Sequence, residues 1–171
     1  KLIAVPLVIT SLVCGVASLS DYKKLSRMGG KTIALYLATM AAFLVLDVAM
    51  LTLFMKALFE RNIGPMMLED PKLGVAGIFY LFYVGGILWF CSWPALAQGE
   101  GGGGMPPWAR AALNGAILGM LAYGTYEWVN MATLKGWTWR MVTIDTLWGG
   151  VITGSSAAAG VLAVRALGMA R

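Results

Sequence analysis

The sequence contains no histidine among its 171 residues. Histidine is the commonest general base and metal ligand, so its absence excludes His-ligated haem, most catalytic zinc sites and Ser-His triads. Cysteine is nearly absent too. Cys14 and Cys91 lie in separate apolar segments without CxxC spacing, which favours buried free thiols over a disulfide or a metal site. The chain therefore lacks the side chains on which most soluble catalytic centres depend.

Charged residues are also scarce. They make up only 12% of the chain, whereas hydrophobic residues make up 59%; a typical soluble domain is about a quarter charged. The net charge of +5 comes from Lys and Arg between apolar runs, where these side chains would meet lipid headgroups. No basic stripe suited to nucleic acid is present. The composition predicts an integral membrane protein whose surroundings are membrane lipids, not nucleic acid.

Five apolar runs are long enough, or nearly so, to cross a bilayer, which takes roughly 20 helical residues. They span residues 2–19, 32–55, 73–97, 109–131 and 141–164. None shows the alternation of a strand. We predict an all-α fold, a polytopic transmembrane helix bundle with four core helices and one N-terminal apolar helix. Residues 1–30 would form that additional helix and a basic loop, and residues 31–171 the four-helix transmembrane domain.

The first run has a second interpretation. A basic residue, an apolar stretch and small residues follow one another in residues 1–20, as they do in a signal peptide. We expect a retained helix. A bacterial inner membrane is the expected location, or the thylakoid or mitochondrial inner membrane if a transit peptide was removed before Lys1. Lys and Arg are divided almost equally between the two sides, so the positive-inside rule leaves the orientation open.

Three carboxylates fall inside the predicted spans: Asp47, Glu127 and Asp145. A charged side chain at mid-membrane costs about 2.5–3.5 kcal/mol on insertion scales, so such residues are rare unless they are used. Successive spans cross the membrane in opposite directions. Four span ends therefore lie on the same side of the membrane: the end of run 32–55, the start of run 73–97, the end of run 109–131 and the start of run 141–164. All three carboxylates should therefore occupy the same half of the bilayer.

Further polar side chains belong to that half. Tyr123, Tyr126, Glu127 and Asn130 are spaced at three and four, which places them on one helix face. The complete candidate set, a ligand-binding site or a structural polar cluster with no catalytic or metal-binding role, is Asp47, Tyr80, Tyr83, Tyr123, Tyr126, Glu127, Asn130, Asp145 and Trp148. Two interpretations remain open. These groups could hydrogen-bond between helices and lock the bundle, or line a cavity for a lipid headgroup, a quinone-like ring, a pigment or a proton.

Two other patterns predict local structure. Trp137 and Trp139 fall in the turn before the last run, at the depth where aromatic belts form. Small residues recur at four-residue spacing in the last two runs, including Gly115, Gly119 and Gly154. Such stripes allow close helix contact, and we expect packing within the bundle in preference to dimerisation.

From Ile33 onward the chain resembles a family of bacterial predicted membrane proteins, the domain-of-unknown-function family 2177. The stretches that carry the resemblance are Tyr36-Leu-Ala-Thr, Phe43-Leu-Val-Leu-Asp47, Phe79-Tyr-Leu-Phe-Tyr-Val-Gly85, Ala122-Tyr-Gly-Thr-Tyr-Glu-Trp-Val-Asn-Met-Ala-Thr-Leu-Lys-Gly-Trp137, Val142-Thr-Ile-Asp145 and Trp148-Gly149. Family members usually have Tyr-Asp-Leu-Thr-Asn where this chain has Tyr126-Glu-Trp-Val-Asn130, so the carboxylate is kept on a longer arm and the hydroxyl is lost. The resemblance implies a four-span core and no particular activity.

Two functions are consistent with these features. The leading hypothesis is a small non-enzymatic accessory or structural subunit of a larger respiratory or photosynthetic membrane complex, with other membrane-protein subunits as partners. There Glu127 or Asn130 could ligate a pigment in place of histidine. The alternative is a membrane enzyme or carrier for a lipid-like small molecule, with Asp47, Glu127 and Asp145 as proton-handling groups. The cofactor is not identified; a lipid and a pigment are both compatible with the sequence.

Overall fold

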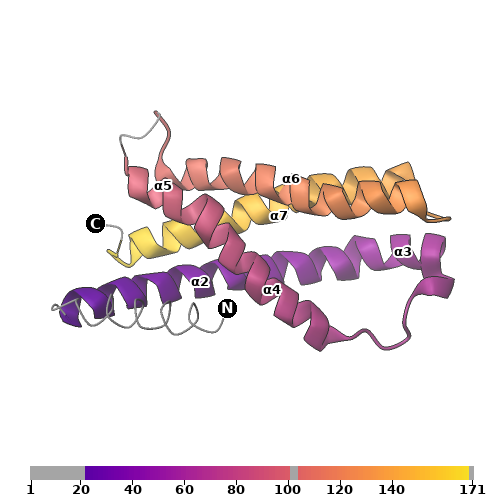
Figure 1. Ribbon diagram of the computed structural model, residues 1–171, viewed down its shortest axis with the longest axis horizontal. Helices are drawn as coiled ribbons and strands as arrows, with labels where there is room; N and C mark the ends of the chain where they lie inside the picture. Colours follow the sequence, from indigo (N-terminus) through magenta and orange to yellow (C-terminus); the bar gives the residue numbers. More distant parts are fainter. Residues whose placement is uncertain (1–21, 101–103, 170–171) are drawn as a thin grey trace, which may run out of the picture.

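The computed structural model describes residues 22–100 and 104–169, and every regular element in them is a helix (Figure 1). This confirms the predicted all-α membrane bundle. The predicted N-terminal helix of residues 2–19 lies outside the described residues. Three described segments, Met28–Met66, Leu73–Gln98 and Trp139–Ala166, are long and apolar enough to cross a membrane. The remaining long helix is 27 residues in length, but its glycines and polar side chains lower its hydropathy.

The first long segment is one continuous rod. It consists of α2 (Tyr22–Met50), a π-helical turn at Leu51–Met55 and α3 (Lys56–Ile63). It begins ten residues before the predicted start at residue 32, so residues expected in a basic loop form the first turns of α2. Lys, Leu, Arg and Met are good helix formers, and hydropathy marks only the lipid-facing part of a helix. The rod ends in a short 3₁₀ turn, Gly64–Met66, where Pro65 interrupts the helical pattern.

The second long segment also contains a π-helical turn. α4 (Leu73–Ile87) continues through Leu88–Ser92 into α5 (Trp93–Gln98). Pro94, just beyond the turn, has no N–H to donate, and its ring would clash with the carbonyl four residues earlier in a regular helix. The wider turn accommodates this proline. The segment ends at Gly99, whose φ of 62° favours glycine.

The last two long helices form a closely packed hairpin. α6 (Pro107–Thr133) and α7 (Trp139–Ala166) are joined by a short turn, and the Thr138 hydroxyl caps α7 by accepting from the Met141 N–H. A Cβ added at Gly115 would lie 2.9 Å from both the Gly154 Cα and the Thr153 carbonyl oxygen. The two backbones therefore touch where the glycines meet. These stripes pack within the bundle, as expected.

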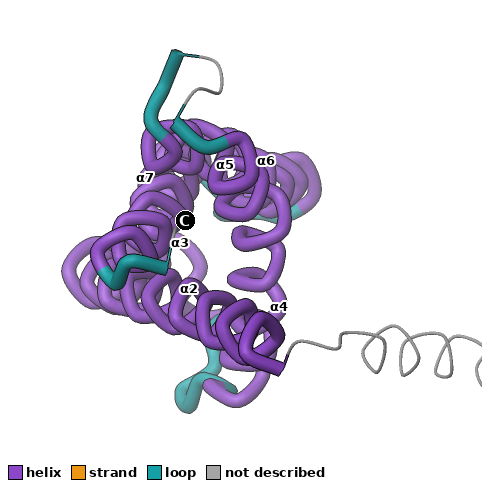
Figure 2. Tube along the Cα trace, turned by 90° about the vertical axis from the view of Figure 1, so that its left-hand side faces the viewer, coloured by secondary structure: helices purple, strands orange, loops and turns teal. Residues whose placement is uncertain are grey.

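The two remaining helices differ in how they pack on this hairpin. α2 runs along α7, where Gly160 faces Thr39 and Leu35. α4 crosses α2 obliquely, and its N-terminal end diverges from the hairpin (Figure 1). Seen along the bundle, α2 lies opposite α5 and α6, and α4 runs along one flank from α5 down to α2 (Figure 2). The core between them contains Phe43, Val84 and Ile152, all 0% exposed.

A buried arginine closes the end of the bundle where α5 connects to α6. Arg110 is only 7% exposed. Its guanidinium donates to the Gln98 Oε1 at 3.0 Å, to the Gly99 carbonyl at 3.0 Å and to the Met105 carbonyl at 2.7 Å. The planar guanidinium can serve several acceptors at once, so one side chain holds both ends of the connecting loop.

Candidate functional site: a cavity between the helices

A cavity of about 840 Å³ lies where α2, α4, α6 and α7 face one another. Known small-molecule pockets measure roughly 300–1,000 Å³, so its size suits a ligand. Seven of the nine residues in the predicted polar cluster line it: Asp47, Tyr80, Tyr83, Tyr123, Tyr126, Asp145 and Trp148. The remainder of its wall is mostly apolar. The structure thus brings most of the predicted cluster to one cavity.

Asp47 stands on α2, one turn before the π-helical segment, and is 6% exposed. Its Oδ2 accepts a hydrogen bond from the Tyr80 hydroxyl at 2.5 Å, which joins α2 to α4. Phe43, one turn earlier on α2, packs edge-on against Tyr80 and Tyr83 with ring centroids 5.4 and 5.6 Å apart. These contacts fix the tyrosine rings at the cavity wall. π-helical turns are frequent at functional sites, and Leu51 and Met55 of this one also line the cavity.

Tyr83 links the same wall to α7. Its hydroxyl lies 2.9 Å from the Thr153 Oγ1, and its ring meets that of Tyr123 edge-on at 6.5 Å. Thr153 is fully buried and was absent from the predicted cluster. The signal was present, because Thr153 follows Asp145 by eight residues and therefore belongs to the same helical stripe.

Glu127 occupies a different place from the other carboxylates. It is 0% exposed and does not line the cavity. Its Oε2 accepts a hydrogen bond from the Trp137 Nε1 at 2.7 Å. The Asp145 carboxyl lies directly beside it, within hydrogen-bonding reach. Asp145 is thus a carboxyl at the cavity wall with a second carboxyl behind it.

The sequence places Trp137 at the depth of the interface, and the structure adds that its ring points inward. Trp137 is 7% exposed and packs edge-on against Phe59 and Tyr126, with ring centroids 5.7 and 5.6 Å apart. A buried carboxyl requires a donor, and the indole N–H provides one while its ring adds apolar contact. Trp139 is 59% exposed, as expected of an interfacial residue.

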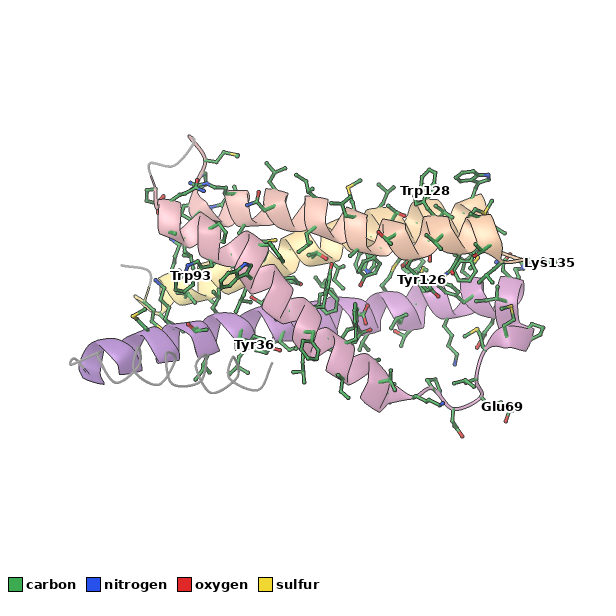
Figure 3. The ribbon with its side chains drawn as sticks, in the orientation of Figure 1. Tyr36, Glu69, Trp93, Tyr126, Trp128 and Lys135 are labelled. Atoms are coloured by element: carbon green, nitrogen blue, oxygen red, sulfur yellow. The ribbon has the colours of Figure 1, made fainter. Side chains whose placement is uncertain are left out.

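Asn130 stays outside the cavity. It lies half-buried on α6, one turn beyond Tyr126, and its side chain interacts with the Tyr126 side chain. Tyr126 lies on the side of α6 that faces α3, whereas Trp128 lies on the outer side (Figure 3). Trp148 lines the cavity, and its buried Nε1 has no hydrogen-bond partner in the described part of the chain.

The cavity has an open side that the sequence does not reveal. Val75 and Phe79 of α4 line it and are nevertheless 67% and 60% exposed. Lys72, the residue before α4, also lines it and is exposed. The opening therefore follows the diverging N-terminal half of α4. Within the described residues, 22–100 and 104–169, no group of three His, Cys, Asp or Glu side chains is placed to hold a metal ion.

The fold and site define a small polytopic α-helical membrane protein with a ligand-sized internal cavity. A family model described as "Predicted membrane protein (DUF2177)" matches residues 32–162, and the chain belongs to this family. It is also similar to proteins named "Proton/sodium-glutamate symport protein" from Geobacillus stearothermophilus and Bacillus caldotenax, with 64% identity over 33 residues. That stretch is 19% of this chain and 8% of each symport protein. No solved structure matches the chain.

Proposed function

We propose that this protein binds a lipid-like amphiphile in the cavity, as a membrane carrier or enzyme for that molecule. The observation that carries the proposal is the cavity of about 840 Å³ with a mostly apolar wall and carboxyl groups at Asp47 and Asp145. Apolar pockets with a few placed polar groups are the usual form of small-molecule sites. The apolar wall suits a hydrocarbon chain, and the carboxyls suit a polar group.

The open side supports entry from the bilayer. The exposed Val75 and Phe79 belong to α4, which is part of one of the segments apolar enough to span a membrane. A hydrocarbon chain could therefore pass beside these side chains without crossing water. A carrier and an enzyme both have to bind the amphiphile first. The size of the cavity and its open side support this binding step.

A protein that serves only to pack against other subunits has no need of such a space. An empty cavity forfeits dispersion contacts along its walls and destabilises the fold. The accessory-subunit hypothesis stays a prediction, and no feature of the described residues favours it over ligand binding.

The test is to fill the cavity. Ala76 on α4 and Ala122 on α6 both line it, and Ala76→Trp or Ala122→Trp would place an indole inside. Ala41→Trp is the matched control, because Ala41 is exposed on α2 and does not line the cavity. The probe is tetradecanol, titrated into protein held in a non-ionic detergent and followed by native mass spectrometry.

We expect one tetradecanol to bind the wild type and the Ala41→Trp control. Both cavity variants should bind it at least about tenfold more weakly, which corresponds to about 1.4 kcal/mol. Equal binding by all four proteins, or no binding by the wild type, contradicts the proposal. Thermal unfolding of each variant in the same detergent checks that the added indoles leave the fold intact.

A further inference from the structure

No Lys or Arg of the described residues forms an ion pair with the carboxyls at the cavity. Among the described residues the ion pairs are Lys56–Glu60, at 3.8 Å, and Arg165–Glu100, and none of these four residues lines the cavity. None of the three carboxyls, Asp47, Glu127 and Asp145, forms an ion pair with a Lys or Arg of the described segments. Buried carboxylates in membrane spans usually pair with a cation or serve a pathway or a ligand. Within the described part of the chain, these carboxyls therefore have no paired counter-charge.

Aromatic side chains line the same cavity as these carboxyls. Tyr80, Tyr123 and Trp148 line the cavity together with Asp47 and Asp145. The faces of aromatic rings carry negative potential and attract cations, and the attraction is greater when the cation is desolvated. Aromatic cages are the characteristic binding sites of quaternary ammonium groups. Rings and carboxyls here favour the same kind of ligand group.

A second carboxyl lies behind the wall of the cavity. Glu127, 0% exposed, accepts a hydrogen bond from Trp137 and stands directly behind Asp145. A positive charge held by Asp145 would be attracted to this second carboxyl as well, because electrostatic interactions are stronger in a medium of low dielectric constant.

We propose that the ligand is a cationic amphiphile, whose ammonium group is held by Asp47 and Asp145 within the ring of aromatic side chains and whose hydrocarbon chain follows the apolar wall. This inference rests on the proposed function and specifies its ligand class. Among the described residues, Lys72 is the one basic residue that lines the cavity. It lies at the exposed end of the cavity, immediately before α4. It does not pair with the carboxyls, so it leaves them available.

The experiment compares three probes with the same chain: tetradecyltrimethylammonium, tetradecanol and tetradecyl sulfate. Each is titrated into the wild-type protein in non-ionic detergent, with native mass spectrometry as the readout. The variants are Asp47→Asn, Asp145→Asn and the double variant, which remove charge while keeping side-chain size. The control is Asp70→Asn, because Asp70 is exposed in the loop before α4 and does not line the cavity.

We expect the wild type to bind the ammonium probe about tenfold more tightly than the alcohol, a difference of about 1.4 kcal/mol, with the sulfate weakest. Each single variant should reduce that preference and the double variant should abolish it, whereas tetradecanol binding and the Asp70→Asn control stay unchanged. Lys72→Gln should not weaken the ammonium probe, since it removes a positive charge from the rim.

The outcomes separate this inference from the proposed function. If tetradecanol binds and Ala76→Trp blocks it, but the wild type shows no preference for the ammonium probe, the cavity binds amphiphiles and the charge assignment is wrong. The charge assignment is equally wrong if Asp70→Asn lowers the preference as much as Asp47→Asn does. If none of the three probes binds, the proposed function fails and the inference fails with it.

Discussion

The hydrogen bond between Glu127 and Trp137 should be one of the strongest polar contacts in the bundle, and a double-mutant cycle can measure it. The two side chains are 0% and 7% exposed, and the Nε1 to Oε2 distance is 2.7 Å. Glu127→Leu removes the acceptor at similar volume, and Trp137→Phe removes the donor. Each single variant leaves a buried polar group without its partner, a loss of about 1–3 kcal/mol.

Two magnitudes set the expected coupling energy. A hydrogen bond to a charged group contributes about 1.5–3 kcal/mol in soluble proteins. Interhelical polar pairs in membranes average about 0.6 kcal/mol and reach about 1.7 kcal/mol, because the unfolded chain in lipid also finds partners. Since both groups here are more than nine-tenths buried, we expect a value near the upper membrane limit, about 1.5 kcal/mol. Loss of the Phe59 and Tyr126 ring contacts in Trp137→Phe cancels in the cycle.

The assay is reversible unfolding in bicelles by increasing SDS, followed by far-UV circular dichroism for the wild type, both single variants and the double variant. Circular dichroism is chosen because the fluorescence of Trp137 itself changes. Glu127→Gln, which keeps an acceptor oxygen, is the control and should lose less stability than Glu127→Leu. A coupling energy below about 0.5 kcal/mol would refute the reasoning, since it would be no greater than that of an average interhelical polar pair in a membrane.

Two further predictions use the same unfolding assay. Gly115→Ala should destabilise the bundle by about 1–3 kcal/mol, because its Cβ would lie 2.9 Å from the backbone of α7. Gly85→Ala on α4 is the control: its Cβ would meet nothing within 4 Å, and the substitution should stabilise the bundle by about 0.5–1 kcal/mol. Equal effects of the two substitutions would contradict the close packing of α6 on α7. Arg110→Lys should destabilise by about 2 kcal/mol, since an ammonium cannot reproduce the guanidinium bonds to Gln98, Gly99 and Met105. The exposed Arg61→Lys is its control, and a loss as small as that of the control would show that the loop does not depend on Arg110.

Most of the architecture follows from run length and connectivity. The helices at Leu73–Gln98, Pro107–Thr133 and Trp139–Ala166 begin and end within a few residues of the apolar runs, because glycine and proline mark their ends. The start of α2 could not be predicted in the same way. Its first turns carry basic residues, and hydropathy does not distinguish a charged loop from a charged helical turn outside the lipid.

The candidate site was partly predictable for a related reason. Counting residues from the ends of the runs places Asp47 and Asp145 in the same half of the bilayer, and the structure brings both to one cavity. Counting does not say which way a side chain in a turn points. Trp137 lies at the depth of the interface, yet its ring turns inward because Glu127 needs a donor. That need arises from the packing of α6 on α7, which depth alone does not specify.

The three membrane carboxyls therefore divide into two kinds, and mutational data on them have different meanings. Asp47 and Asp145 line the cavity, so their isosteric amides should alter the selectivity of ligand binding while the helices stay assembled. Glu127 is removed from the cavity and bonded to Trp137, so its substitution should first change the free energy of unfolding. Loss of ligand binding in a Glu127 variant is evidence for a ligand site only if that variant unfolds like the wild type. Loss of binding in Asp47→Asn with unchanged unfolding is direct evidence, and the comparison of the two separates a binding role from a structural one.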